Sequence, residues 1–121
     1  MDRSEVAIKC EEKAFEMLKK VYEDKNCLPD KVYKDEDCFI IHWNWIKWCD
    51  YIYEDIAAIA GVLDELDKLQ KPDNHEDTGY GYKFMRLGES DDDVETRKND
   101  YDIELWMIRK IDIPEGLEEV K

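Results

Sequence analysis

Long apolar runs are missing from this 121-residue sequence. No segment approaches the roughly 20 apolar residues of a membrane-spanning helix. The first ten residues, MDRSEVAIKC, lack the basic start and the apolar run of a secretory signal peptide. The four cysteines form no C-x-x-C pair, and free thiols in a reducing compartment are then the default. We therefore expect a cytoplasmic protein without membrane contact.

Catalytic motifs are missing as well. The sequence contains no G-x-S-x-G, H-E-x-x-H, phosphate-binding loop or dinucleotide-binding fingerprint, and its only histidines are His42 and His75. A cysteine–histidine catalytic pair needs an activated thiol beside an imidazole, and a sequence alone does not show which side chains are neighbours in space. We predict that the protein is not an enzyme and uses no cofactor.

Two kinds of metal site fit the residue types but not the spacing. Cys38, His42 and Cys49 offer the ligands that zinc prefers, yet on a straight strand Cys49 points away from the other two. The acidic segments 73–77 and 91–95 offer oxygen ligands for calcium but lack the spacing of an EF-hand loop. Buried small cysteines and solvated loops are the simpler interpretations, so we predict no metal site.

Positive charge is scarce. Lys and Arg number 18 against 32 Asp and Glu, which gives a formal net charge of −14. A field of this sign repels phosphate backbones, and no Lys/Arg-rich stripe offsets it, so we expect no direct binding of nucleic acid. The same field accelerates encounter with a basic protein surface. Solubility alone is the alternative explanation of the charge.

Apolar material is nevertheless sufficient for a core. Hydrophobic residues make up 43% of the chain and aromatic residues 12%, which distinguishes it from disordered chains of similar charge. The length is that of one domain, and we expect residues 1–121 to form a single acidic domain.

The hydrophobic pattern predicts two helices. Residues 4–25 carry apolar side chains at helical spacing after Ser4, a good N-cap, and Pro29 prevents continuation. Residues 54–69 show the clearest apolar stripe, with two acidic residues in the first turn and Pro72 beyond the end.

Alternating residues predict the strands. Residues 38–49, CFIIHWNWIKWC, are apolar on both faces, which is typical of a central strand, and a helix is the alternative there. A short strand is expected at 32–33, and segments 80–87 and 101–113 are expected to pair as a hairpin around the acidic stretch 88–100. The predicted fold class is α+β: two helices packed on a small, mainly antiparallel sheet of three to four strands, in the order α-β-α-β-β.

A candidate partner-binding surface combines acidic and aromatic residues. If the second helix and the acidic hairpin loop lie on one side, their carboxylates imitate a row of phosphates. Alternate residues of a strand face opposite sides of the sheet, so Trp48 is placed on the other face from Trp43 and Trp45. Trp48 is therefore expected to face a neighbouring molecule, and two tyrosines follow it. Burial of that face under the second helix is the alternative. The predicted partner-binding residues are Asp64, Glu65, Asp67, Asp91, Asp92, Asp93, Glu95, Trp48, Tyr51 and Tyr53.

These features favour a small inhibitor that acts by binding protein. Its partner is expected to be a basic protein, such as a nuclease or a nucleic-acid-binding effector, whose groove the acidic side occludes. Phage anti-defence proteins of the anti-CRISPR type and immunity proteins that neutralise toxins are the natural settings. The alternatives are a small-molecule or nucleotide-binding module that uses the aromatic strand, and a structural or assembly subunit that forms a homo-oligomer.

Overall fold

The computed structural model describes residues 3–49, 51–70, 78–90, 92–107 and 111–120. In these residues six strands form one antiparallel sheet in the order β5-β4-β1-β3-β2-β8, and β6 and β7 form a small second sheet. The elements along the chain are β1 (Ser4–Glu11), α1 (Glu12–Asp24), β2 (Lys31–Asp35), β3 (Cys38–Ile46), α2 (Glu54–Leu69), β4 (Tyr82–Leu87), β5 (Val94–Lys98), β6 (Trp106–Met107), β7 (Ile111–Asp112) and β8 (Glu118–Val120).

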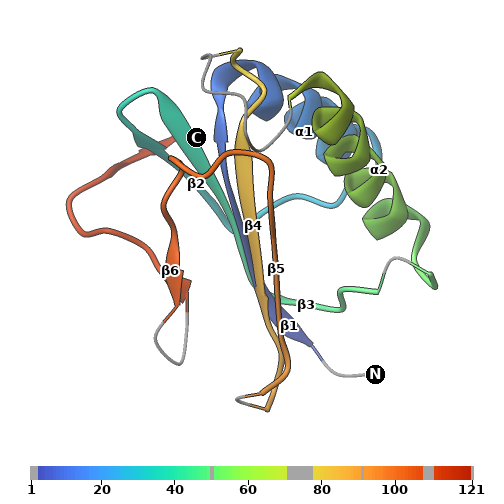
Figure 1. Ribbon diagram of the computed structural model, residues 1–121. Coiled ribbons are helices and arrows are strands. Elements are labelled where there is room, and N and C mark those ends of the chain that lie inside the picture. Colours follow the sequence, from blue (N-terminus) through green and yellow to red (C-terminus); the bar gives the residue numbers. More distant parts are fainter. Residues whose placement is uncertain (1–2, 50, 71–77, 91, 108–110, 121) are drawn as a thin grey trace.

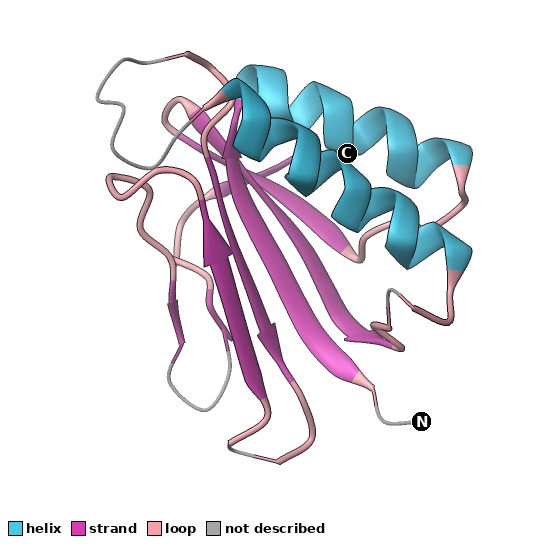
Figure 2. Cartoon of the chain, turned by 45° about the vertical axis from the view of Figure 1, so that its right-hand side comes forward, coloured by secondary structure: helices cyan, strands magenta, loops and turns pink. Residues whose placement is uncertain are grey.

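The first six elements follow the order β-α-β-β-α-β, and β3 lies between β1 and β2 in the sheet. This is the ferredoxin-like, or split β-α-β, arrangement. Both helices lie side by side on one face of the sheet (Figures 1 and 2). Strands β5 and β8 extend the sheet at its two edges.

The α+β class fits this architecture, but the predicted sheet of three to four strands and the order α-β-α-β-β are wrong. The largest error lies in residues 4–11, which are strand β1 and not the start of a helix. Val6, Ala7 and Ile8 are all buried because β1 pairs with β3 on one side and with β4 on the other. Consecutive apolar residues suit a central strand and an apolar helix face equally well.

The prediction of one strand over 101–113 paired with 80–87 is also wrong: the described residues of this range hold only the short strands β6 and β7, which pair with each other. The strand that pairs with β4 is β5, which lies inside the acidic stretch. Ile103 and Leu105 are both buried, and Leu105 packs on the sheet face opposite the helices together with Ala7, Ile40 and Met85. Figure 1 shows β6 on that side. Alternating burial therefore occurs here without a ladder of hydrogen bonds.

Several predicted elements are confirmed. The second helix has the predicted limits, Glu54–Leu69, and the aromatic segment forms a strand, Cys38–Ile46. Strand β2 includes the predicted positions 32–33, and strand β4 covers residues 82–87 of the predicted strand 80–87. In the described part of the chain, no helix has the length and apolar character needed to cross a membrane.

The main core lies between the helices and the sheet. It joins the apolar stripes of both helices to the side chains of β1, β3 and β4 that face them. Trp43 is at its centre, 2% exposed, and its ring packs edge-on against Tyr22 of α1. Tyr82 of β4 donates a hydrogen bond to Asp67 of α2, and the edge strand β5 next to β4 therefore lies beside this helix.

Candidate functional site

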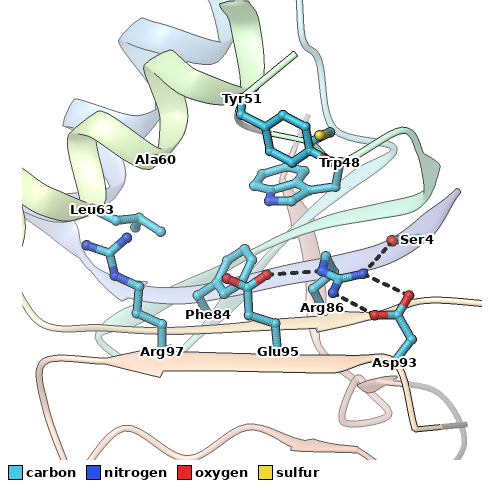
Figure 3. A pocket seen from close by; sticks show the side chains of 11 residues that line it. Ser4, Trp48, Tyr51, Ala60, Leu63, Phe84, Arg86, Asp93, Glu95 and Arg97 are labelled. Atoms are coloured by element: carbon cyan, nitrogen blue, oxygen red, sulfur yellow. Dashed lines mark hydrogen bonds and ion pairs between the residues drawn. The ribbon is translucent and has the colours of Figure 1, made fainter. Parts of the chain in front are cut away.

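A cleft of about 370 Å³ opens between α2, the loop after β3 and the β4–β5 hairpin (Figure 3). One side is aromatic: Trp48 and Phe84 lie with their ring centroids 5.6 Å apart, and Tyr51 stands at the edge. The other side is charged, because Arg86 and Arg97 reach into it from neighbouring strands.

Arg97 ties the hairpin to the second helix. Its Nη2 lies 2.5 Å from Asp64 Oδ1 and 2.8 Å from Asp67 Oδ2, one turn apart on α2. Burial lowers the pKa of the Arg97 guanidinium, but hydrogen bonds to Asp67 and Asp64 outweigh this and the pKa is raised. The guanidinium thus fixes two carboxylates of α2 beside β5.

Arg86 orders the carboxylates of the hairpin. Its Nη2 lies 2.8 Å from Asp93 Oδ1, its Nε donates to Glu95 Oε1 at 3.1 Å, and its Nη1 donates to Ser4 Oγ at 3.1 Å. The hydrogen bonds from Arg86 lower the pKa of Asp93. A Cβ atom at Gly88 would collide with the Asp93 carboxylate, so glycine is needed there for this arrangement.

The surface around the cleft remains negative after this pairing: Arg86 and Arg97 balance Asp93 and Glu95 in the lining, and Asp64 and Asp67 lie beside it on α2. Four carboxylates face two guanidinium groups, which leaves an excess of two negative charges. Asp92 is exposed next to Asp93 and adds to the excess, whereas Glu65 lies beside Lys68 and does not. A phosphate group is repelled by the excess of carboxylates around these two arginines, whereas a cation is attracted by it.

A β-bulge decides where the tryptophans point. Val6 pairs with Trp43 and Ser4 pairs with Ile46, so β3 contains one extra residue in this interval. Such a bulge reverses the alternation of side chains. Trp48 therefore packs against Trp43, with centroids 5.4 Å apart, while Trp45 is 59% exposed. The expectation that Trp48 and Trp43 face opposite sides is wrong.

The other predicted aromatic residues differ in exposure. Tyr51 is 85% exposed and lines the mouth of the cleft. Tyr53 is partly buried against the main core. Of the predicted set, Tyr51 is therefore the aromatic side chain most accessible to a partner.

The predicted acidic residues divide into three groups. Asp64, Asp67, Asp93 and Glu95 are brought together by the two arginines. Glu65 lies 4.0 Å from Lys68 on α2, and Asp92 accepts a hydrogen bond from Ser90. Asp91 and the acidic loop 73–77 lie outside the described residues.

The predicted partner-binding residues include neither arginine of the cleft. Arg86 lies at an alternate position of the same strand as Tyr82 and Phe84, so the pattern of the sequence already placed its side chain on the same face of the sheet. Arg97 carried no such signal, because an edge strand that is largely exposed shows no apolar pattern.

His42, Cys27 and Cys38 lie outside the lining of the cleft, whereas Cys49 belongs to it. His42 Nε2 lies 2.6 Å from Glu5 Oε2 on the sheet face opposite the helices. Burial raises the pKa of Cys27 to about 12 and that of Cys38 to about 11, which disfavours the reactive thiolate. Within the described residues, no group of three or more His, Cys, Asp or Glu side chains is arranged to hold a metal ion.

Comparisons of the chain with protein-family models, curated proteins and solved structures find no match. A fold by itself does not define a function, so the function must be inferred from the chemistry of the cleft.

Proposed function

We propose that this chain is a small inhibitor that binds a basic protein through its acidic cleft surface. This surface consists of Tyr51, Asp64, Asp67, Asp93 and Glu95. The observation that carries the proposal is the bridging by Arg97 and Arg86, which holds the carboxylates of α2 and of the β4–β5 hairpin on one surface. The exposed ring of Tyr51 lies beside them.

Fixed carboxylates suit recognition of a basic surface. The arginines orient them before the partner arrives, so less side-chain freedom is lost on binding. The net charge of −14 attracts a positively charged partner from a distance and raises the association rate. Tyr51 then offers the kind of aromatic contact that often carries much of the binding energy of an interface.

Occlusion is the proposed mechanism. A groove that binds nucleic acid holds phosphates with Lys and Arg side chains, and the carboxylates of the acidic cleft surface would occupy the same side chains. This mechanism needs no bond to be made or broken, so we propose a binding role and not an enzymatic one. We expect the protein to act in the cytoplasm, and its four free cysteines agree with a reducing compartment.

Affinity capture from a bacterial lysate tests the proposal. With the chain as bait, a basic nucleic-acid-binding protein is expected at about 50 mM salt and is expected to be lost at about 500 mM, because salt screens exposed charges. Asp64→Asn combined with Glu95→Gln should weaken binding of that protein about tenfold or more.

A matched control separates the site from the overall charge. Glu16→Gln combined with Asp24→Asn removes two exposed carboxylates from α1, away from the cleft, and should change the affinity less than about twofold. Equal losses in the two double variants would mean that net charge alone determines binding. Absence of a basic partner at both salt concentrations would overturn the proposal.

A second candidate function rests on the size and lining of the cleft. Its volume of about 370 Å³ is within the usual range of small-molecule sites, and Trp48, Phe84 and Tyr51 form aromatic walls. Aromatic faces next to carboxylates favour an organic cation over a nucleotide, because the phosphates of a nucleotide would meet negative charge.

A further inference from the structure

Strand β5 presents an open edge in the described part of the chain, where it pairs only with β4. The Asn99 N–H donates to the Tyr82 carbonyl at 3.2 Å, and the Gly88 N–H donates to the Asp93 carbonyl at 2.7 Å. The backbone groups of positions 93 and 99 therefore form hydrogen bonds toward β4. In an antiparallel ladder, hydrogen-bonded and non-hydrogen-bonded residue pairs alternate. It follows that the peptide N–H and C=O groups of positions 94, 96 and 98 point outward.

The sequence of this edge is complementary to itself. We propose that two copies of the chain associate by antiparallel pairing of β5 with β5, around a two-fold axis at Thr96. In this register Glu95 lies opposite Arg97 of the partner subunit, and Arg97 lies opposite Glu95 of the partner subunit. Opposite charges at facing positions stabilise an antiparallel pair, and the two-fold symmetry forms both pairs at once.

The side chains have atoms left for these contacts. Glu95 and Arg97 both line the cleft, so they project to the same face of the sheet. Glu95 uses Oε1 to contact Arg86, and Arg97 uses Nη2 to contact α2. In the described residues, Glu95 Oε2 and Arg97 Nε and Nη1 make no hydrogen bond or ion pair. They are positioned to meet across the new pair of strands.

The proposed dimer joins the two sheets into one, with the helices of both copies on the same side. The clefts of the two copies then lie next to each other across the axis. Because each copy carries a net charge of −14, repulsion opposes association, and added salt screens this repulsion. Dimerisation should thus strengthen as salt is added, whereas binding of a basic partner should weaken. The dimer does not depend on the proposed inhibitor function.

Thr96→Pro tests the backbone contact. Proline removes the outward N–H at position 96, while the inward bonds of Glu95 and Arg97 to β4 stay possible. Thr96→Ala removes the side chain and keeps the N–H. In sedimentation equilibrium, the proline variant should raise the dimer dissociation constant about tenfold or more, and the alanine variant should change it less than about threefold. A monomeric wild-type chain at all concentrations and salts, or equal effects of the two variants, would overturn the proposal.

Charge exchange tests the register. Glu95→Lys alone and Arg97→Glu alone each place like charges opposite each other in a homodimer, so each variant should be monomeric. When the two variants are mixed, every facing pair is again of opposite charge, and native mass spectrometry should detect the heterodimer. Circular dichroism confirms that each variant is folded. Failure of two folded variants to associate would contradict the Glu95–Arg97 register.

Discussion

Replacement of Trp43 by alanine should lower the free energy of unfolding by about 3–5 kcal/mol, the range observed for large aromatic residues in protein cores. The side chain is 2% exposed, its Nε1 donates to the Cys27 carbonyl at 3.1 Å, and its ring contacts Tyr22 and Trp48. Alanine would remove these contacts and leave a cavity between α1 and the sheet.

Trp45→Ala is the matched control and should cost less than about 1 kcal/mol, because exposed positions tolerate substitution. Trp45 has the same parity along the chain as Trp43, so a regular strand would bury both residues or neither. The bulge in β3 is the reason for the difference in exposure. Urea unfolding followed by far-ultraviolet circular dichroism measures both losses, and equal losses would contradict this explanation of β3.

Asn99→Ala should destabilise the fold by about 3 kcal/mol, because several buried polar groups would lose a partner. Asn99 is fully buried just after β5. Its Oδ1 accepts from the Tyr82 N–H at 2.8 Å, and its Nδ2 donates to the carbonyls of Leu66 and Tyr80, each at 3.1 Å. One side chain thus connects the ends of α2 and β5 with the start of β4.

Asn44→Ala provides the comparison for Asn99 and should change stability by less than about 0.5 kcal/mol. Asn44 is exposed, and in the described residues its side chain makes no hydrogen bond. Denaturant unfolding gives the difference in unfolding free energy between the two variants, provided that this free energy falls with denaturant concentration at the same slope in both. A loss below about 1 kcal/mol for Asn99→Ala would mean that these hydrogen bonds contribute little net stability.

The elements predicted correctly are those in which local pattern and tertiary environment agree. Helix α2 has one apolar stripe facing the sheet, so its period of 3.6 residues is visible in the sequence. Strand β3 is rich in aromatic and β-branched residues. Both elements could be recognised without knowledge of their neighbours.

The elements missed depend on contacts between distant segments. β1 is a strand because β3 and β4 pair with it on both sides, and nothing local distinguishes Val6, Ala7 and Ile8 from the start of the apolar stripe of α1. β5 is charged and exposed, and it is a strand because it pairs with β4.

The candidate site was predictable only as far as its residues form local patterns in the sequence. The many acidic residues of α2 and of the hairpin indicated a binding surface, on the condition that the two segments lie on the same side of the molecule. The sequence could not show that Arg97 meets Asp64 and Asp67, because that contact joins residues about thirty positions apart. Nor could it show that Arg86 and Arg97 neutralise part of the acidic surface while fixing its geometry.

Competition with nucleic acid tests the central claim most directly. The basic protein obtained by affinity capture is bound to a fluorescently labelled nucleic acid, and this chain is titrated into the complex while anisotropy is recorded. We predict that the label is released as the acidic cleft surface binds, that Asp64→Asn with Glu95→Gln releases it poorly, and that Glu16→Gln with Asp24→Asn releases it as wild type does. Unchanged or increased anisotropy, with the chain and the nucleic acid bound together, would contradict occlusion.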